Sequence, residues 1–539
     1  MTAALADQAR LDLPGHWPAA LAPRILATID APTPLLAVDL TTVTDRYTAF
    51  TAALPGVSTF FAMKCNADED VIGTLAALGS SFEVASVGEL RILQDLGIDP
   101  AEVLYSNPIK PPAAIAEARR AGLWRFSFDS EGELHKLAQH APGAAVYIRL
   151  RVDDSTSLFP LSRKFGAEAH EARALMHLAH ELGLHPYGIT FHVGSQCATT
   201  SAWRQAIAAA GRLMTALQSD GIHLEMLDIG GGFPARYVER VPSLDQIAAA
   251  ITPALAELLP YRPALLAAEP GRHLVAESAV LITSVLGREV RAGENWLYVD
   301  VGAYNGMMET QQTVQQWRFP LWTSRPDHAL VPHLPFTVTG PSCDSSDTMF
   351  YGVNLPSTID VGDHLYIGSA GAYTLSYASH FNGFAPPEPV ILGAPPRIAA
   401  SITSNPPIPV NTPSRDQTAR DGIAGAPPSH NPASRNSAPR EPALREPAPR
   451  ESAPLAASRE PASRESAPRE LASRESAPLR PGSREPVSRE SAPRGLAARE
   501  SAPLRPGSRE PVSREPAPRG SVSREPAPHI APDRAQART

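Results

Sequence analysis

The sequence predicts an α/β fold, with a (β/α)8 barrel of the TIM type, then an all-β domain and a disordered tail. Three observations predict it. Eight short apolar runs alternate with stretches of helical periodicity between about residue 58 and residue 271. After residue 271, β-rich segments are separated by Gly, Pro and Asn. From about residue 401 onward the chain is mostly Ser, Arg, Glu, Pro and Ala.

The eight apolar runs are interpreted as the strands of the barrel. They read TFFAMKCN, SFEVAS, VLYSNP, RFSFDS, AVYIRL, YGITFHVG, EMLDIGGG and ALLAAEPG. Stretches between them, such as DEDVIGTLAALG and VGELRILQDLG, have apolar residues at helical spacing. An open, doubly wound sheet would show the same alternation, but eight repeats favour the closed barrel.

These patterns divide the chain into four parts. We expect the barrel over residues 36–275 and the all-β domain over 276–395. The segment 1–35, with its Pro-rich end, is interpreted as an addition to the β-domain. The remainder, 396–539, is a degenerate repeat of the type SREPAPRESAP, which cannot bury enough apolar surface to fold. A solvated tail is therefore expected, with partner binding as the alternative.

The net charge differs between the expected folded part and the expected tail. Residues 401–539 carry 22 Arg and 16 acidic residues, a net of +6, which leaves a net of −14 for residues 1–400. An acidic folded part argues against nucleic acid as the main partner.

Three cysteines, Cys65, Cys197 and Cys343, show no metal-binding spacing and fit a reducing compartment. No signal peptide and no membrane-spanning run is evident, so a cytoplasmic protein without a membrane partner is expected.

Lys64 stands where the first strand ends, within AMKCN. The chain has only four lysines, the others being Lys110, Lys136 and Lys164. Because barrel active sites form at the C-terminal ends of the strands, Lys64 is a candidate nucleophile for imine chemistry. Lys110 in a Pro-rich loop and Lys136 on an amphipathic helix are expected to be solvated surface charges.

Glycine-rich turns follow the seventh and eighth strands. LDIGGGFP places Gly230, Gly231 and Gly232 in succession, and AEPGR places Gly271 and Arg272 beside the last strand. Glycines permit positive φ and expose N–H groups that can cradle a phosphate. Either motif alone could be a tight turn, but barrel phosphate sites commonly follow strands seven and eight. Together the turns indicate a phosphate-bearing ligand.

Two more polar side chains share this expected mouth. Glu269 ends the eighth strand, where a buried carboxylate needs a positive partner. A protonated pyridine nitrogen would be one such partner, and a nearby Arg is the alternative. FHVGSQ at the end of the sixth strand supplies His192 and Ser195. His192 could stack on a flat ring or be an ordinary core histidine.

Together these motifs resemble the ornithine/diaminopimelate/arginine decarboxylase family of fold-type III pyridoxal phosphate (PLP) enzymes, over about residues 30–390. The resemblance implies PLP as cofactor, with Lys64 of FAMKCN holding it as a Schiff base. It implies that His192 stacks on the cofactor ring and that Glu269 pairs with the pyridine nitrogen. The other cofactor contacts that it implies are Glu83 in FEVAS, Arg149 in YIRL, Ser195, Gly230, Gly231, Gly232, Gly271, Arg272, and Tyr373 in SAGAYT.

In the β-domain, GPSCDSSD resembles the ornithine decarboxylase segment that contains a catalytic cysteine. By that resemblance Cys343 protonates the substrate carbon after CO2 leaves, and Asp344 contacts the distal amine. Both would reach the site of the other subunit, which implies a homodimer, and Lys164 would pair with Asp347 across its interface. Further substrate contacts are implied for Tyr304 and for Phe381 in HFNGF.

The resemblance favours ornithine as the substrate, giving putrescine for polyamine biosynthesis. One departure concerns the distal amine: animal-type enzymes carry a second aspartate after the tyrosine that corresponds to Tyr304. This chain reads AYNGMMETQQTVQQW there, with Glu309 at another offset. Lysine, arginine and diaminopimelate therefore stay alternatives, although diaminopimelate enzymes usually show Cys-Glu in place of Cys343-Asp344.

Two other functions are disfavoured. By family resemblance, an amino-acid racemase would have an arginine at the pyridine nitrogen, where this chain has Glu269. A non-catalytic regulator like the antizyme inhibitors would have degraded its cofactor residues, whereas Lys64, Glu269 and Cys343 are all present.

Overall fold

The computed structural model describes residue 25 and residues 31–313, 316–325 and 330–393. The expected tail, 396–539, and most of the expected N-terminal segment, 1–35, lie outside these described residues. The predictions for those two segments are therefore not tested.

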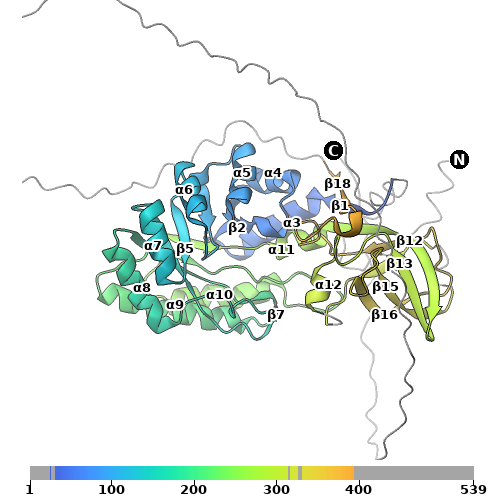
Figure 1. Ribbon diagram of the computed structural model, residues 1–539. Coiled ribbons are helices and arrows are strands. Elements are labelled where there is room, and N and C mark those ends of the chain that lie inside the picture. Colours follow the sequence, from blue (N-terminus) through green and yellow to red (C-terminus); the bar gives the residue numbers. More distant parts are fainter. Residues whose placement is uncertain (1–24, 26–30, 314–315, 326–329, 394–539) are drawn as a thin grey trace, which may run out of the picture. The chain divides into compact units, whose positions relative to one another are not determined.

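Eight parallel strands close into a barrel (Figure 1). The strands are β2 (Ser58–Ala62), β3 (Ser81–Val84), β4 (Val103–Tyr105), β5 (Arg125–Phe128), β6 (Ala145–Leu150), β8 (His185–Phe191), β10 (Met226–Asp228) and β11 (Leu265–Ala268). The last strand, β11, pairs with the first, β2, where Ala267 lies opposite Ser58. This closure excludes the open sheet and confirms the predicted barrel, with every expected run supplying one strand.

Helices alternate with these strands along the chain. They are α3 (Leu40–Ala53), α4 (Glu69–Ala77), α5 (Val87–Asp95), α6 (Pro112–Arg120), α7 (Glu131–His140), α8 (Ala169–Glu181), α9 (Ser201–Ser219) and α10 (Leu244–Glu257). Local sequence determines where several of them begin. Asp68 accepts hydrogen bonds from two N–H groups in the first turn of α4, and Ser243 forms a capping box with Gln246 at the start of α10.

The β-rich segments form a second, mixed sheet. Its strands are β1 (Leu35–Asp39), β12 (Ala279–Arg291), β13 (Glu294–Val299), β14 (Leu321–Thr323), β15 (His333–Thr339), β16 (Thr348–Pro356), β17 (His364–Ile367) and β18 (Glu388–Leu392). β1 pairs antiparallel with β12 and parallel with β18. The chain thus contributes one strand to this sheet before it enters the barrel and returns to the sheet after leaving it.

Short elements lie between the barrel strands and this sheet. They are η1 (Met63–Cys65), α11 (Arg272–Val275), η3 (Ala276–Ser278), α12 (Glu309–Gln312), η4 (Phe381–Gly383) and the strand pair β7 (Ser157–Phe159) with β9 (Ser195–Cys197). The Tyr373 N–H donates to the Cys65 carbonyl at 2.8 Å, and Asn66 Nδ2 donates to the Gly371 carbonyl at 2.9 Å. These bonds hold a loop of the β-domain over the end of β2.

The barrel interior is packed with side chains. One layer of inward-facing residues consists of Phe60, Leu104, Ala145, Tyr147, Tyr187, Met226 and Ala267. The Arg125 guanidinium lies 5.5 Å from the Phe60 ring centre. Such layers make the interior a core and leave the strand ends as the place for a binding site.

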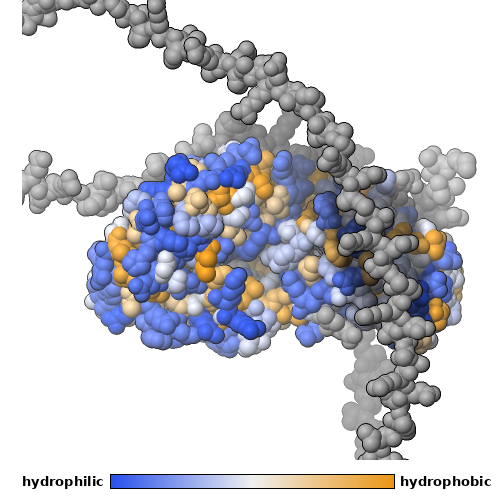
Figure 2. All heavy atoms as spheres, in the orientation of Figure 1, coloured by the Kyte–Doolittle hydropathy of each residue, from blue (hydrophilic) through white to orange (hydrophobic). Residues whose placement is uncertain are grey.

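Hydrophilic residues cover most of the face seen in Figure 2, with hydrophobic ones scattered among them. Isolated apolar side chains of this kind are normal on a protein surface. Among the described residues, no helix combines the length and the apolar character needed to cross a membrane.

Lys110 corrects one expectation from the sequence, because its side chain is fully buried. Its ammonium group lies 2.9 Å from Glu133 Oε1 and donates to the carbonyls of Asn107 and Ser127 at 2.9 and 2.6 Å. Burial lowers the pKa of Lys110 to about 8, and the Glu133 carboxylate opposes that shift. The Pro-rich loop is thus anchored to β5 and α7.

Lys110→Met is expected to lower the free energy of unfolding by about 3 kcal/mol, because it removes one partner of a buried ion pair. The urea midpoint at fixed protein concentration measures this loss. Lys136→Met is the matched control: this lysine also pairs with Glu133, but its side chain is 30% exposed, so a smaller loss is expected. Equal midpoints for Lys110→Met and the wild type would contradict the structural role of Lys110.

Candidate active site

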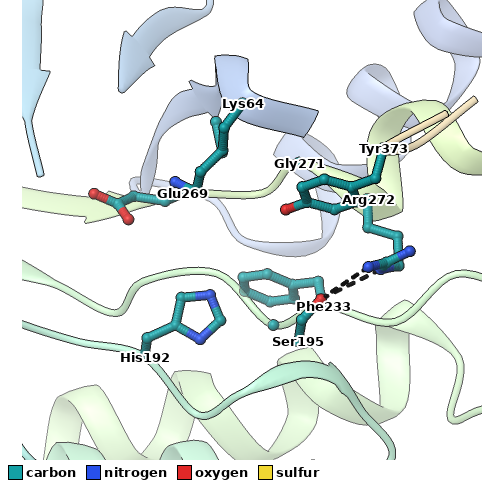
Figure 3. A pocket seen from close by; sticks show the side chains of 10 residues that line it. Lys64, His192, Ser195, Phe233, Glu269, Gly271, Arg272 and Tyr373 are labelled. Atoms are coloured by element: carbon teal, nitrogen blue, oxygen red, sulfur yellow. Dashed lines mark hydrogen bonds between the residues drawn. The ribbon is translucent and has the colours of Figure 1, made fainter. Parts of the chain in front are cut away.

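Eight of the residues expected to bind a cofactor line one cleft at the C-terminal ends of the barrel strands. They are Lys64, His192, Ser195, Gly232, Glu269, Gly271, Arg272 and Tyr373, joined by Ala62 and Phe233, which the sequence did not single out. Figure 3 shows Lys64 and Glu269 on one side of the cleft and His192 on the opposite side, with Arg272 and Tyr373 at one end.

Lys64 lies in the single turn η1 that follows β2, so the strand end aims its side chain into the cleft. Its ammonium group forms an ion pair with Glu83, which ends β3 one strand away. Burial by itself would lower the pKa of Lys64, but Glu83 and Glu269 outweigh burial and raise it. Burial raises the pKa of the Glu83 carboxyl to about 7. The Lys64 amine therefore keeps its proton in this ion pair, and Glu83 holds the amine in position.

Glu269 follows β11 and is only 8% exposed. Burial, reinforced by the nearby Asp228 carboxylate, raises the pKa of Glu269 to about 8. The Ser106 hydroxyl donates a hydrogen bond to Glu269 Oε1. Arg149, on β6, contributes a positive charge to the same region, although burial lowers its pKa. A buried carboxylate in this setting favours a cationic partner in the cleft.

His192 comes directly after β8. Its Nδ1 accepts the Gly194 N–H at 3.0 Å, which places the ring proton on Nε2 in the neutral form. Burial holds the pKa of His192 well below its usual range, and the charges of Arg149 and Lys64 add to that effect. A Cβ at Gly231 would come within 3.0 Å of Nε2, so glycine is needed there to leave the imidazole its place.

Arg272 lies at the opposite end of the cleft, enclosed by aromatic rings. Its guanidinium carbon is 4.7 Å from the ring centres of Tyr373 and Trp317. It donates to Ser195 Oγ at 3.3 Å, drawn as dashed lines in Figure 3, and forms a bidentate ion pair with Glu309 at 2.6 and 2.9 Å. Glu309 therefore pairs with Arg272. This explains why Glu309 does not lie at the sequence offset expected for a carboxylate that binds the distal amine.

The glycine turn after β10 adds a cradle beside this end of the cleft. Gly230 has φ +64°, and a Cβ there would lie 1.9 Å from the Phe191 carbonyl oxygen. Gly232 has φ +95° and lines the cleft itself. Only glycine satisfies both the backbone conformation and the close approach.

These groups fit PLP. One end of the cleft offers hydroxyl groups, a guanidinium and a glycine turn, which suit a phosphate dianion. The other offers the Glu269 carboxylate for a protonated ring nitrogen, with Lys64 between the ends and His192 facing them. In the described part of the chain, no group of three His, Cys, Asp or Glu side chains is arranged to hold a metal ion.

The expected substrate residues gather elsewhere, on the surface of the β-domain. Cys343 and Phe381 are exposed, and neither lines the Lys64 cleft. The Tyr304 hydroxyl donates to Asp344 Oδ2 at 2.9 Å, and the Tyr304 ring lies 4.7 Å from that of Phe381. The Ser346 N–H, and then Tyr304, lower the pKa of Asp344. We call these four residues the exposed cluster.

Asp347, which was expected to pair with Lys164 of another subunit, has hydrogen-bond partners within its own chain, and the pair between subunits stays a prediction. Asp347 is 1% exposed, and its two oxygens accept the N–H groups of Ala303 and Ser342 at 2.7 and 3.1 Å. Lys164 lies over the Phe165 ring at 4.8 Å. Asp347 fixes the loop that carries Cys343, which is a structural role within its own chain.

Comparisons with known proteins agree with this site. A family model for the pyridoxal-binding domain of pyridoxal-dependent decarboxylases matches residues 40–276. The chain is 35% identical to a lysine/ornithine decarboxylase of Selenomonas ruminantium, over 69% of this chain and 93% of that protein. It is also 35% identical to antizyme inhibitor 2 of Xenopus laevis, over 64% of this chain and 78% of that protein. A solved lysine/ornithine decarboxylase of Vibrio vulnificus, complexed with putrescine, superposes with a TM-score of 0.63 at 31% identity, over 70% of this chain and 99% of that one.

Proposed function

The chain belongs to the fold-type III pyridoxal-dependent decarboxylases, and from that premise we propose that it converts L-ornithine to putrescine and CO2. It is a PLP-dependent carboxy-lyase of the group that acts on basic amino acids. The observation that supports a substrate with a distal ammonium is the Asp344 carboxylate, the one charged group of the exposed cluster, which lies next to Cys343 and accepts a hydrogen bond from the Tyr304 hydroxyl.

In this proposal each residue of the cleft has a separate task. When bound, PLP withdraws the electron pair that the departing carboxylate leaves on the substrate carbon. Lys64 supplies the amine that attaches the cofactor, and the ion pair with Glu83 holds that amine in place. Glu269 places negative charge opposite the ring nitrogen. The neutral His192 covers the ring face without adding charge, so the electron-withdrawing character of the ring is preserved.

We further propose that two chains share each active site. Cys343 is an exposed thiol that lines no part of its own chain's Lys64 cleft, so a second copy must present it if it protonates the substrate carbon. In the same domain, the aromatic side chains of Tyr377, Phe381 and Phe384 are 43%, 42% and 36% exposed. Apolar surface of this kind marks an interaction face, and a two-fold dimer would bury it.

The charge of the exposed cluster distinguishes between the candidate substrates. One carboxylate suits the single distal ammonium of ornithine or lysine. Diaminopimelate carries a distal carboxylate as well, and none of the four residues of the cluster supplies a cation for it. The shorter ornithine is preferred to lysine on the resemblance of the Cys343-Asp344 segment. All three cysteines are free, which fits the proposed cytoplasmic location and a role in polyamine synthesis.

Release of CO2 from ornithine, lysine, arginine and meso-diaminopimelate tests the substrate. We expect the highest kcat/KM with ornithine, and a loss of about 10²-fold in Asp344→Asn, because an ion pair with the bound amine disappears. Asp99→Asn is the matched control, since Asp99 accepts the N–H two residues on, as Asp344 does, but lies before β4 at the far end of the barrel. A higher kcat/KM with another amino acid would replace ornithine by that substrate.

The likeness to antizyme inhibitor 2 supplies the second candidate, a regulator without catalysis. The same substrate panel decides between the two. Cofactor bound at Lys64 without CO2 release from any of the four amino acids would favour the regulator. Release from any one of them establishes the enzyme.

A further inference from the structure

Glu269 is linked by hydrogen bonds to two hydroxyl groups that the function described so far does not use. Ser106 follows β4 and contacts Glu269, which is 163 residues further along the sequence. Tyr147 Oη lies 2.9 Å from Ser106 Oγ. Tyr147 belongs to the packed layer of the barrel interior, and its ring is fully buried. Hydrogen bonds thus connect Tyr147 in the barrel core, through Ser106, to Glu269 in the cleft.

The direction of these hydrogen bonds follows from their chemistry. When Glu269 is ionised, as pairing with a protonated ring nitrogen requires, its oxygens only accept, so the Ser106 hydroxyl donates its proton to Glu269 Oε1. Ser106 Oγ then has only lone pairs left for Tyr147, so the Tyr147 O–H donates to it. Burial, with the charge of Glu269 behind it, raises the pKa of Tyr147 well above its usual range, which keeps that phenol protonated and able to donate.

Glu269 needs such a donor because its surroundings oppose its charge. It is buried, and the Asp228 carboxylate lies near enough to raise its pKa further. Asp228 has its own donors, since its oxygens accept the Thr190 hydroxyl at 2.6 Å and the Gly230 N–H at 2.9 Å. Of the two neighbouring carboxyl groups, Asp228 is therefore the better stabilised anion. Without a cofactor in the cleft, Glu269, with a pKa of about 8, is therefore the carboxyl group that holds a proton, and the Ser106 hydrogen bond opposes this protonation.

We propose that Ser106 and Tyr147 are positioning residues that keep Glu269 ionised and aimed at the cofactor's ring nitrogen. The proposal rests on the role of Glu269 as the partner of that nitrogen. A proton between ring nitrogen and carboxylate lies on the nitrogen only if the carboxylate is stabilised as an anion. Ser106 provides this stabilisation through its hydrogen bond, and Tyr147 strengthens it by polarising the Ser106 hydroxyl.

Ser106→Ala removes the donor, and Tyr147→Phe removes only the group behind it. The full-length protein reconstituted with PLP labelled with 15N in the ring reports the proton directly, because the nitrogen chemical shift differs between protonated and unprotonated pyridine. In Ser106→Ala we expect the resonance to move toward the unprotonated position and kcat to fall about ten-fold, since hydrogen bonds to charged groups are the strong ones. The KM is expected to stay within about two-fold, because neither residue reaches the substrate.

Tyr147→Phe is expected to give a smaller change in the same direction, about three-fold in kcat. The double variant should match Ser106→Ala alone, because Tyr147 acts only through the Ser106 hydroxyl. Ser127→Ala is the matched control: Ser127 lies on the neighbouring strand β5, is fully buried, and its hydroxyl has no hydrogen-bond partner among the described residues. Its resonance and kcat should equal those of the wild type.

Glu269→Gln separates this proposal from the one on which it rests. If Glu269→Gln shifts the nitrogen resonance and Ser106→Ala and Tyr147→Phe do not, the hydroxyl chain has no such role. If Glu269→Gln leaves the resonance unchanged, Glu269 is not the partner of the ring nitrogen, and the assignment under the proposed function fails. Should Ser106→Ala fail to fold, Tyr147→Phe, which lies outside the cleft, still gives the decisive resonance. If the two single variants had equal effects and the double variant showed their sum, Tyr147 would not act through Ser106, and the proposal would also be overturned.

Discussion

Lys64→Ala is expected to abolish both CO2 release and the visible absorbance of the bound cofactor. The variant lacks the only lysine amine that lines the cleft in the part of the chain that the structure describes, so PLP has no covalent attachment there. Loss of a covalent catalytic group lowers kcat on the order of 10⁴-fold or more. Absorbance of the purified protein, followed by CO2 release from ornithine, measures both effects.

Lys64→Arg is the matched control for charge. Arginine keeps a cation beside Glu83 but offers no nucleophilic amine at neutral pH. If the covalent bond is what matters, Lys64→Arg loses the absorbance as Lys64→Ala does, while its cleft keeps the ion pair that Glu83 makes in the native chain. Unchanged absorbance in either variant would remove Lys64 from the proposed mechanism.

Mixing Lys64→Ala protein with Cys343→Ala protein is expected to restore activity that neither has alone. If each site takes Lys64 from one chain and Cys343 from the other, a hybrid dimer has one site with both lesions and one site with none. Random exchange at equal amounts gives about one quarter of the wild-type activity, because half of the dimers are hybrids. Activity after subunit exchange, measured against each variant incubated alone, reports this recovery.

A mixture of Lys64→Ala with Lys64→Arg is the control, since both lesions fall on the same residue and no pairing of these chains restores a site. The shared site would be refuted if hybrids form, as shown by separately tagged chains, and activity does not return. Recovery in the control mixture would show that exchange is not the cause.

The barrel and most of the cleft could be predicted from the sequence because their signals are local. Buried parallel strands read as short apolar runs, and the glycines after β10 and β11 stand next to the strands that position them. His192 and Glu269 follow their strands directly and Lys64 lies two residues after the end of β2, so predicting the strands also placed these side chains at one mouth.

What the sequence could not show depends on contacts between distant segments. Nothing around Lys110 indicates that Glu133, 23 residues away on α7, would bury and neutralise it. Ser106 is an unremarkable residue at a strand end until the closed barrel brings it to Glu269. The partner of Arg272 likewise comes from α12, beyond the barrel, and in the sequence Glu309 is only an acidic residue at an unexpected offset. A polar residue at the end of a strand indicates that such a contact exists, but its partner can be identified only from the three-dimensional structure.

The Arg272–Glu309 ion pair links the fold's two halves thermodynamically. Arg272 belongs to the cleft and Glu309 to the chain that leads into the second sheet, and both side chains are almost completely buried. A ligand that binds only the native state adds to the stability of that state by an amount that grows with the logarithm of the ligand concentration divided by Kd. The Arg272 guanidinium belongs both to this ion pair and to the end of the cleft that we propose for the cofactor phosphate. Cofactor binding is therefore expected to stabilise the junction of the two parts as well. Cofactor binding and the association of the two parts are then coupled. The protein with bound cofactor is expected to unfold in a single transition, at a higher Tm than the cofactor-free protein.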